Sequence, residues 1–213
     1  TGLRQGLGTV TEVERADSEP EVPSTRTIGV VLLIAGLIGE VAALVLSVEK
    51  YWLLTNPFYT PSCDIGSVIS CGAIMDSDQS AAFGFPNPYL GLAGFGVVAA
   101  TGAAILAGAR LAAWYRISLL GGTLLAIVFV CWLMVQSLFV LKALCPYCMA
   151  VWAVTFTTAW YAFLHVASLM RHRLSETAGT WLDRLAGNHS AIITGALTLI
   201  AVLVAVTAWI NIA

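Results

Sequence analysis

Long apolar runs separated by polar stretches dominate the chain. The first run covers residues 27–48 and contains one acidic side chain, Glu40. About 20 apolar residues in a helix cross a bilayer, so a run of this length predicts a membrane-spanning helix. Four later runs predict four more spans, at residues 88–108, 117–141, 145–168 and 190–211. The pattern indicates an all-α membrane protein with five spans.

Composition supports this interpretation. Of the 213 residues, 59% are hydrophobic and 10% are charged, and the mean hydropathy is +0.87. Soluble globular domains carry about 25% charged residues, so the chain is predicted to be an integral membrane protein. Its net charge of −2 offers no attraction for nucleic acid, and no nucleic-acid partner is expected.

The polar segments divide the chain further. Residues 1–26 mix acidic and basic side chains with two prolines, which predicts a disordered tail. Residues 49–87 form a long loop with prolines, glycines and two cysteines, and loops of this length are usually functional. Ile74 to Phe83 are expected to form a short helix within it. Residues 171–189 form a shorter connection before the last helical segment, residues 190–213.

Lysine and arginine are unevenly divided between the connections. Lys50 and Lys142 lie on one side of the predicted membrane, whereas six arginines lie on the other: Arg26, Arg110, Arg116, Arg171, Arg173 and Arg184. Because such residues accumulate on the cytoplasmic side, the N-terminus is predicted to be cytoplasmic and the C-terminus external. The loop at residues 49–87 would then face outward from the cytoplasmic membrane.

Four of the five cysteines provide the candidate chemistry. Cys145 and Cys148 stand in a Cys-Pro-Tyr-Cys motif at the start of the fourth span, and Cys63 and Cys71 lie in the long loop. All four share the predicted outer face, where disulfides persist. Cysteines three positions apart at a helix start can form a disulfide or share a metal, and the helix N-terminus favours a thiolate. The pattern is typical of redox sites and of zinc sites.

Three other residues within or beside the spans carry expectations. Cys131 lies roughly 21 Å along a helix from Cys145 and is expected to be a buried structural thiol. Glu40 is expected to face protein, as a protonated or hydrogen-bonded brace rather than a proton relay. Asn87 followed by Pro88 suits an N-cap and first-turn pair, so capping alone would explain Asn87.

These motifs resemble the vitamin K epoxide reductase family and its bacterial homologues over about residues 27–170. The resemblance rests on the eight-residue separation of Cys63 and Cys71, the Cys-Pro-Tyr-Cys motif, Ser77 at the position of a loop serine, and Asn87 opening the second helix. It implies a four-helix bundle around a quinone, either menaquinone or ubiquinone, with a fifth helix beyond that core.

The resemblance also implies roles for the cysteines. Cys148 would lie beside the quinone ring, Cys145 would exchange with Cys71, and Cys63 would lie nearer a partner protein. A dithiol supplies the two electrons that a quinone takes up. Some relatives carry a fused thioredoxin-like domain, and this chain ends without one, so a separate DsbA-like partner is expected. The expected activity is a thiol:quinone oxidoreductase that supports disulfide formation.

The quinone is expected to contact Ser77, Asn87, Trp152 and Phe156. Trp152 and Phe156 follow Cys148 at intervals of four, so the three share one helix face that could line a flat ring or simply pack. The family commonly has tyrosine at the position of Trp152, and an indole offers no hydrogen-bond acceptor. This departure from the family pattern puts epoxide reduction in doubt.

Three alternatives remain beside this reading. A Cys₄ structural zinc site is disfavoured because Cys63 and Cys71 are eight positions apart, so no metal is expected. A DsbB-like protein is disfavoured because the cysteine loop precedes the second span. A transporter lacks support, since the five spans show no inverted repeat.

Overall fold

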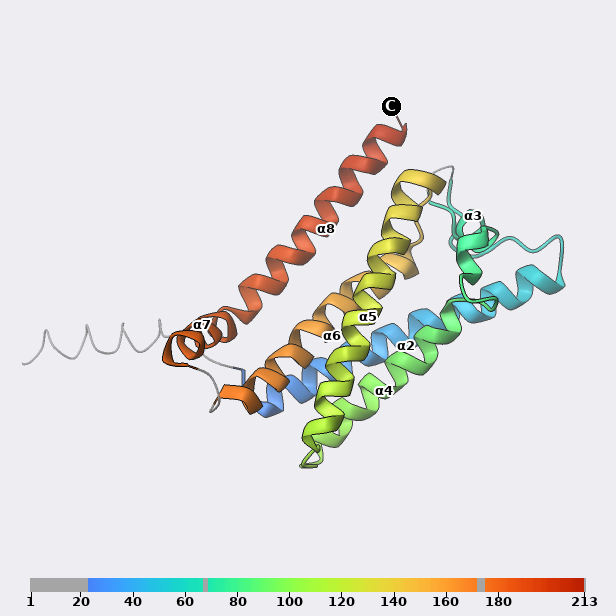
Figure 1. Ribbon diagram of the computed structural model, residues 1–213. Helices are drawn as coiled ribbons and strands as arrows, with labels where there is room; N and C mark the ends of the chain where they lie inside the picture. The colour runs from blue at the N-terminus through green and yellow to red at the C-terminus, as the bar shows by residue number, and fades with distance from the viewer. Residues whose placement is uncertain (1–22, 67–68, 172–174, 213) are drawn as a thin grey trace, which may run out of the picture.

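The computed structural model describes residues 23–66, 69–171 and 175–212. In this part of the chain, five helices are long and apolar enough to cross a membrane, which confirms the predicted all-α membrane fold. They are α2 (Thr25–Thr55), α4 (Pro88–Leu106), α5 (Ala113–Val135), α6 (Pro146–Met170) and α8 (His189–Ile212) (Figure 1). Most of the predicted N-terminal tail, residues 1–22, lies outside the described residues.

Four of these helices form the bundle. α2 packs along α4 and α6, and α5 packs along α6 (Figure 1). A π-helical turn, η2 (Gln136–Leu141), extends α5 and ends at Lys142, whose φ is 51°. α8 touches α6 and η2, and none of its apolar stretch is buried within the protein. The fifth helix therefore lies at the edge of a four-helix core.

Glycines allow α2 and α4 to lie close together. A Cβ atom at Gly36 would be 2.5 Å from the backbone nitrogen of Ala99, and one at Gly102 would overlap the backbone of Leu33. Helices in lipid associate through van der Waals contact, because the lipid tails are as apolar as the side chains. Because glycine has no side chain, the backbones of α2 and α4 come into contact at these positions.

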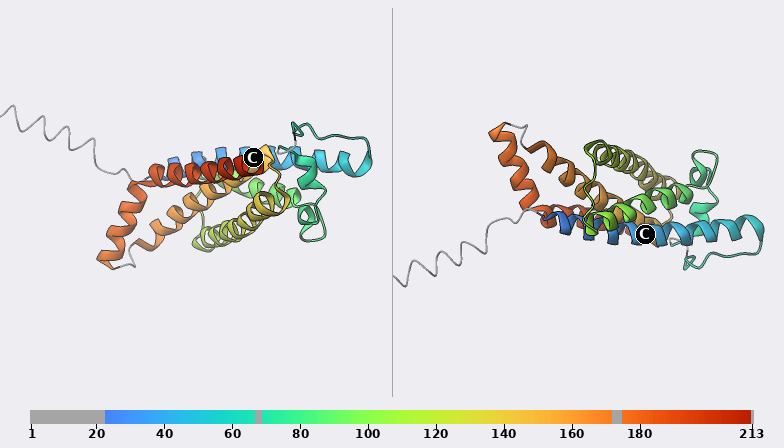
Figure 2. Two further views of the ribbon diagram at one scale, coloured as in Figure 1. Left: turned by 90° about the horizontal axis from the view of Figure 1, so that it is seen from above. Right: turned by 90° about the horizontal axis from the view of Figure 1, so that it is seen from below.

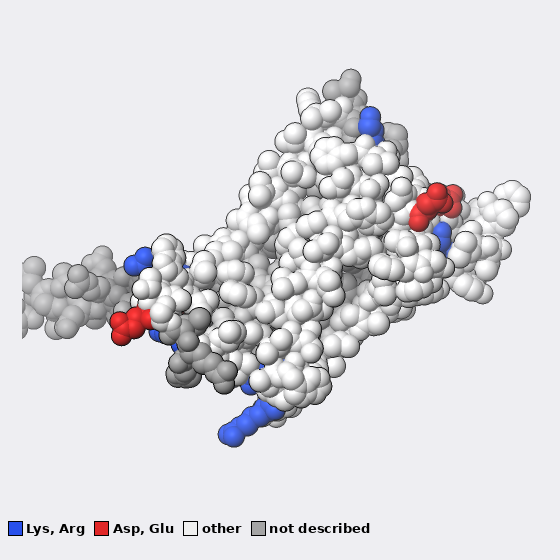
Figure 3. Space-filling view, in the orientation of Figure 1, with Lys and Arg blue, Asp and Glu red and all other residues white. Residues whose placement is uncertain are grey.

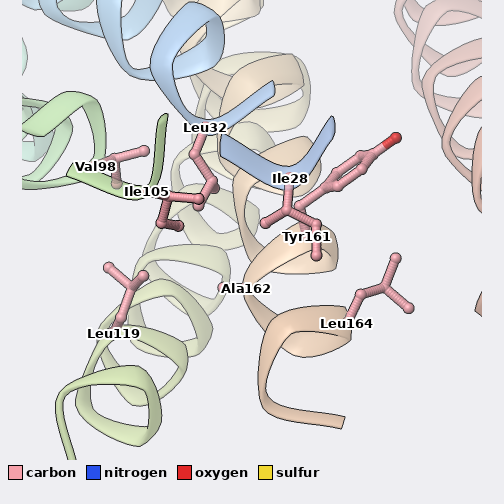
Figure 4. Close-up of a cluster of buried hydrophobic side chains, with 8 residues drawn as sticks. All are labelled: Ile28, Leu32, Val98, Ile105, Leu119, Tyr161, Ala162 and Leu164. Atoms are coloured by element: carbon pink, nitrogen blue, oxygen red, sulfur yellow. The ribbon is translucent and has the colours of Figure 1, made fainter. Parts of the chain in front are cut away.

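Buried side chains from all four core helices close one end of the bundle (Figure 4). The cluster consists of Ile28 and Leu32 of α2, Val98 and Ile105 of α4, Leu119 of α5, and Tyr161, Ala162 and Leu164 of α6. It lies toward the end of the bundle opposite the cysteines. The other end, which we call the cysteine end, carries the loop at residues 56–87 and the start of α6.

Charged side chains gather at the two ends of the molecule, and the surface between them is uncharged in the view of Figure 3. Asp76 and Asp78 belong to the loop at the cysteine end, whereas Arg110 lies in the connection between α4 and α5 at the opposite end. Charge is costly in the centre of a bilayer. This distribution is the one expected of a multi-pass membrane protein.

Several element boundaries differ from the predictions. α2 continues to Thr55 rather than ending at residue 48, so the loop begins at Asn56. The single helix predicted from Ile74 to Phe83 is wrong. The loop instead contains α3 (Cys71–Met75) and a 3-10 turn, η1 (Asp78–Ala81). Ser70 starts α3 by accepting a hydrogen bond from the backbone N–H of Ala73.

The connection between α6 and α8 also contains a helix that was not predicted, α7 (Glu176–Gly187). The Ser175 hydroxyl oxygen caps it by accepting from the N–H of Ala178. The two views of Figure 2 show α7 running crosswise to α8 at the end of the bundle. Arg171, just after α6, pairs with Asp183 and so ties α7 to the core.

Candidate redox site

The loop at the cysteine end brings its two cysteines together. Cys63 and Cys71 form a disulfide, with their Cα atoms 5.7 Å apart. Cys71 is the first residue of α3, and the N–H of Gly72 donates to Asp64 Oδ1 over 3.0 Å. Asp64 directly follows Cys63, and Gly72 directly follows Cys71. This hydrogen bond therefore holds together the chain segments on the two sides of the disulfide.

The second cysteine pair lies where α6 begins. Pro146 occupies the first turn, where its missing N–H removes no helix hydrogen bond, and Cys145 occupies the N-cap position. The Sγ atoms of Cys145 and Cys71 are 2.9 Å apart. The Sγ atoms of Cys63, Cys71 and Cys145 all lie within 4.8 Å of one another. The structure thus places the loop disulfide directly against the helix-end pair.

A backbone contact holds this arrangement. The N–H of Ser70 donates to the carbonyl of Leu144 over 3.0 Å, and Ile69 and Leu144 form an isolated parallel β-bridge. Ser70 directly precedes Cys71, and Leu144 directly precedes Cys145. The contact fixes the two cysteines relative to each other through the main chain, independently of their side chains.

Cys145 is fully buried, and yet its pKa lies below the usual value of a cysteine thiol. The Cys148 thiol donates a hydrogen bond that lowers the pKa of Cys145 below its usual value, and the N–H groups of Cys148 and Tyr147 act in the same direction. Burial and the Asp64 carboxylate oppose this shift of the pKa. The thiolate is the species that attacks a disulfide. Cys145 is therefore prepared to exchange with the neighbouring Cys71.

An apolar cavity of about 580 Å³ lies beside this site, in the size range of small-molecule sites. Its walls come mainly from α4, α5 and α6. Of the predicted site residues, four line it: Ser77, Asn87, Cys148 and Trp152. Phe156, predicted to share that face, is not among the lining residues. The cavity fits a quinone because it combines apolar walls for a hydrophobic ring with one thiol and a few hydrogen-bonding groups.

Asn87 holds the loop over the cavity. Its Nδ2 donates to the carbonyl of Gln79 over 2.7 Å, and its Oδ1 accepts from the N–H of Ala82 over 3.1 Å. Among the described residues its side chain bonds to this loop and not to the first turn of α4, so the capping explanation is wrong. Ser77 donates its hydroxyl proton to the carbonyl of Ile74.

The expectations for Cys131 and Glu40 also need correction. Cys131 is an exposed thiol, so the buried structural role is wrong. An apolar run does not reveal which of its faces meets lipid, and Cys131 lies on the lipid-facing side of α5. Glu40 is partly buried beside α4, but its Oε2 has no hydrogen-bond partner within the described residues. The expectation that Glu40 faces protein is therefore confirmed, whereas the expected hydrogen bond is not seen among the described residues.

Sequence reasoning missed a group of polar residues beneath the loop. Glu49, near the end of α2, accepts hydrogen bonds from Tyr59 and from Ser62. Asp64, which accepts a hydrogen bond from the N–H of Gly72, was not singled out either. The available signal was weak: an acidic residue at the end of an apolar run is ordinary, and its partners follow at no regular spacing.

Comparison with known proteins agrees with this geometry. The sequence model of the vitamin K epoxide reductase family matches residues 30–163, which hold all four site cysteines. A search among curated proteins finds no match to the chain.

Proposed function

The chain belongs to the vitamin K epoxide reductase family and is therefore a membrane oxidoreductase, and we propose that it oxidises a separate thioredoxin-fold protein and reduces a membrane quinone. One observation carries the proposal. Cys71 of the loop disulfide lies 2.9 Å from Cys145, and Cys148, one turn further along α6, lines the apolar cavity. The cysteines thus form a continuous path from the loop to the cavity.

The first exchange takes place at the loop. A thiolate of the reduced, DsbA-like partner attacks Cys63, forming a mixed disulfide and releasing Cys71 as a thiolate. The partner's second thiolate then attacks the partner's own sulfur in that bond. The partner leaves as a disulfide, and Cys63 and Cys71 together hold the electron pair.

The second exchange moves the electron pair to α6. The Cys71 thiolate attacks Cys145 of an oxidised Cys145–Cys148 pair, so a Cys71–Cys145 disulfide forms and Cys148 leaves as a thiolate. Cys63 then attacks Cys71, which restores the loop disulfide and releases Cys145. The backbone contact between Ser70 and Leu144 keeps the attacking and receiving sulfurs adjacent. Two electrons and two protons have passed from the partner to Cys145 and Cys148.

A quinone bound in the cavity supplies the acceptor for the two electrons and two protons that this dithiol gives up as its disulfide re-forms. Cys148 is the thiol that lines the cavity wall, among mainly apolar side chains. Asn87 fixes the turn that covers the cavity, and Trp152 offers an indole N–H and a flat face. Menaquinone and ubiquinone are both candidates for this position.

Quinone reduction by the purified protein tests the proposal. The assay supplies a reduced thioredoxin-fold protein as donor and compares menaquinone and ubiquinone analogues as acceptors. Wild-type protein should reduce one or both, and Cys148→Ala should abolish turnover with every thiol donor. Cys131→Ala, which changes a thiol outside the site, serves as the control. Near-normal turnover by Cys148→Ala would refute the mechanism.

A structural zinc site is the second candidate, because the Sγ atoms of Cys63, Cys71 and Cys145 lie close enough to share an ion. Zinc binds thiolates, and two of these three sulfurs are joined in a disulfide. Cys148, which a Cys₄ site requires, lies outside this group. Metal analysis beside thiol counting, with and without reductant, separates the two candidates: bound zinc with four protected thiols would favour the scaffold.

A further inference from the structure

We propose that Glu49 is a positioning residue: its carboxylate holds Cys63 in place beside Cys71, and release of that hold exposes Cys63 for thiol exchange. The placement of Cys63 stands on the contacts alone, whereas the kinetic consequence rests on the proposed function. Glu49 belongs to α2, a fixed part of the bundle, and Cys63 belongs to the loop that must react.

The contacts of Glu49 converge on the segment just before Cys63. Its Oε1 accepts from the Ser62 hydroxyl over 2.6 Å, and its Oε2 accepts from the Tyr59 hydroxyl over 2.9 Å. The N–H of Ser62 lies 3.3 Å from both carboxylate oxygens. Three donors from two loop residues therefore meet one carboxylate, and one of those residues directly precedes Cys63.

These bonds replace the hydration of a buried carboxylate. Glu49 is 6% exposed, and among the described residues no cation lies within ion-pair distance of it. Hydrogen bonds to a carboxylate are roughly twice as strong as neutral ones. The same contact raises the pKa of Tyr59 above its usual value, because the Glu49 carboxylate accepts its proton in a hydrogen bond. The segment is thus held by strong, directional contacts.

The two halves of the loop disulfide are held by different parts of the protein. Cys71 follows Ser70, which bonds to the segment before Cys145, so Cys71 stays beside its exchange partner. Cys63 is tied to the bundle through Ser62 and Glu49. Asp64 joins Cys63 to the start of α3, but that contact lies within the loop and moves with it. Once the disulfide opens, Glu49 is the described side chain of α2 that hydrogen-bonds to this segment, beside the apolar contact between Trp52 and Tyr59.

The contacts of Glu49 matter for turnover because a partner thiol must reach the sulfur of Cys63. Cys63, which was expected to lie nearer a partner protein, is only 5% exposed, so a protein thiol cannot reach its sulfur in this conformation. Attack on a disulfide requires a thiolate to approach one sulfur in line with the bond. The segment from the end of α2 to Cys63 must move before a protein thiol can reach it, and breaking the Glu49 contacts is the step that frees it.

Alkylation of Cys63 tests the positioning directly. The full chain is prepared with Cys71, Cys131, Cys145 and Cys148 replaced by serine, so that Cys63 is the single thiol, and its reaction with a membrane-impermeant maleimide is timed. Glu49→Ala should accelerate labelling about tenfold or more, as expected for losing bonds to a charged acceptor. Glu49→Gln, which keeps an acceptor for Ser62, should fall between Glu49→Ala and the unchanged residue.

Lys50→Ala is the matched control. Lys50 is the next residue of α2, and its Nζ donates to the carbonyl of Met75, at the end of α3. It therefore ties the same loop to the same helix on the Cys71 side, and its removal should leave Cys63 labelling nearly unchanged. Equal labelling of Cys63 in Glu49→Ala and Lys50→Ala would overturn the proposal, since general loosening of the loop would then explain both.

A second measurement separates positioning from simple loss of stability. With all cysteines present, Glu49→Ala should lower kcat with the protein donor without raising its KM, and the Cys71–Cys145 mixed disulfide should accumulate after acid trapping. A merely destabilised loop would raise KM and leave that species unchanged, which would count against the proposal. Absence of quinone reduction in the wild type would refute the proposed function and leave the alkylation result standing.

Discussion

At the scale of single residues, Cys145 combines two properties that usually oppose each other. It is completely buried, which disfavours a thiolate, and yet hydrogen bonds from Cys148 and from the first turn of α6 favour one. Burial protects the thiolate from solvent reagents. The nearest sulfur is that of Cys71, and a lowered pKa makes Cys145 a better leaving group when the loop disulfide re-forms, so the arrangement favours internal exchange over side reactions with small oxidants.

The pH dependence of Cys145 reactivity follows from this arrangement. A lowered pKa means that the thiolate is populated at a lower pH than in an ordinary cysteine, so its reaction with a small uncharged alkylating agent should reach half-maximum below the usual thiol range. Cys148→Ala removes the largest cause and should move that midpoint to higher pH. Both measurements use a Cys71→Ser background with peptide mapping.

An unchanged midpoint in Cys148→Ala would show that the helix N-terminus, rather than the thiol of Cys148, sets the reactivity of Cys145. Tyr147→Ala is a suitable control. It keeps the backbone N–H groups of the first turn, so the midpoint of Cys145 should stay near that of the parent protein.

The cysteines were predictable from the sequence, and their supporting residues were not. Cys145 and Cys148 were recognisable because their spacing and their place at the end of an apolar run are local features. Glu49 acts on residues ten and thirteen positions later. That link depends on how the loop folds back over α2, which no periodic pattern encodes. The sequence around Asn87 favours an N-cap, but its side chain hydrogen-bonds to Gln79 and Ala82 of the loop instead.

At the scale of helices, the contact between α2 and α4 determines how the cavity is built. The two helices meet through glycine, and the cavity lies where α4 faces α5 and α6, with Ala43 and Leu46 of α2 also in its wall. Gly94 of α4 and Gly122 of α5 both line it, and a Cβ atom at either would meet no other atom within 4 Å. Glycine thus serves both close packing and open space in this fold.

Substitution of two glycines should distinguish a tightly packed position from an open one. Gly102→Ala places a methyl group against the backbone of Leu33 and should lower the free energy of unfolding by about 1–3 kcal/mol, typical of overpacking. Gly121→Ala on α5, where a Cβ meets nothing within 4 Å, is the control and should not destabilise the protein. Thermal unfolding in detergent measures both, and equal melting temperatures would contradict the packing argument.

The sequence predicted which membrane-spanning helices are present better than it predicted where each helix ends. The five spans were evident because their length and hydropathy leave few alternatives. The last turns of α2, Glu49 to Thr55, were assigned to a loop because two charged residues interrupt the apolar run there, although the helix continues. α7 was not predicted because a short amphipathic helix between two spans contains no apolar run. Its stability comes from the Ser175 cap and from the tie between Arg171 and Asp183.

At the scale of the whole molecule, the separation of charge supports the proposed orientation. Arg110 and Arg184 belong to connections at one end, whereas the described basic residues of the cysteine end are Lys50 and Lys142. Basic residues accumulate on the cytoplasmic side of membranes. The proposed arrangement therefore places the redox loop outside the cytoplasm, where a DsbA-like partner would meet it.

Single-cysteine labelling tests this orientation. In a chain without native cysteines, Asp78→Cys should react with an impermeant maleimide in intact cells, and Arg110→Cys should react only after the cells are permeabilised. Both positions lie in exposed connections, so accessibility to reagent is matched. The reverse labelling pattern would place the redox loop in the cytoplasm and would exclude a secreted partner.

The length of α2 links the redox loop to the physical state of the membrane. Its 31 residues span about 46 Å at 1.5 Å per residue, against a hydrocarbon thickness of about 30 Å. The excess must be taken up by tilt or by protrusion, and lipids of different chain length change that balance. Because Glu49 and the loop lie at the far end of α2, thicker bilayers should draw them toward the headgroups. Reconstitution in lipids of increasing acyl length should then slow turnover with a protein donor more than turnover with a small dithiol.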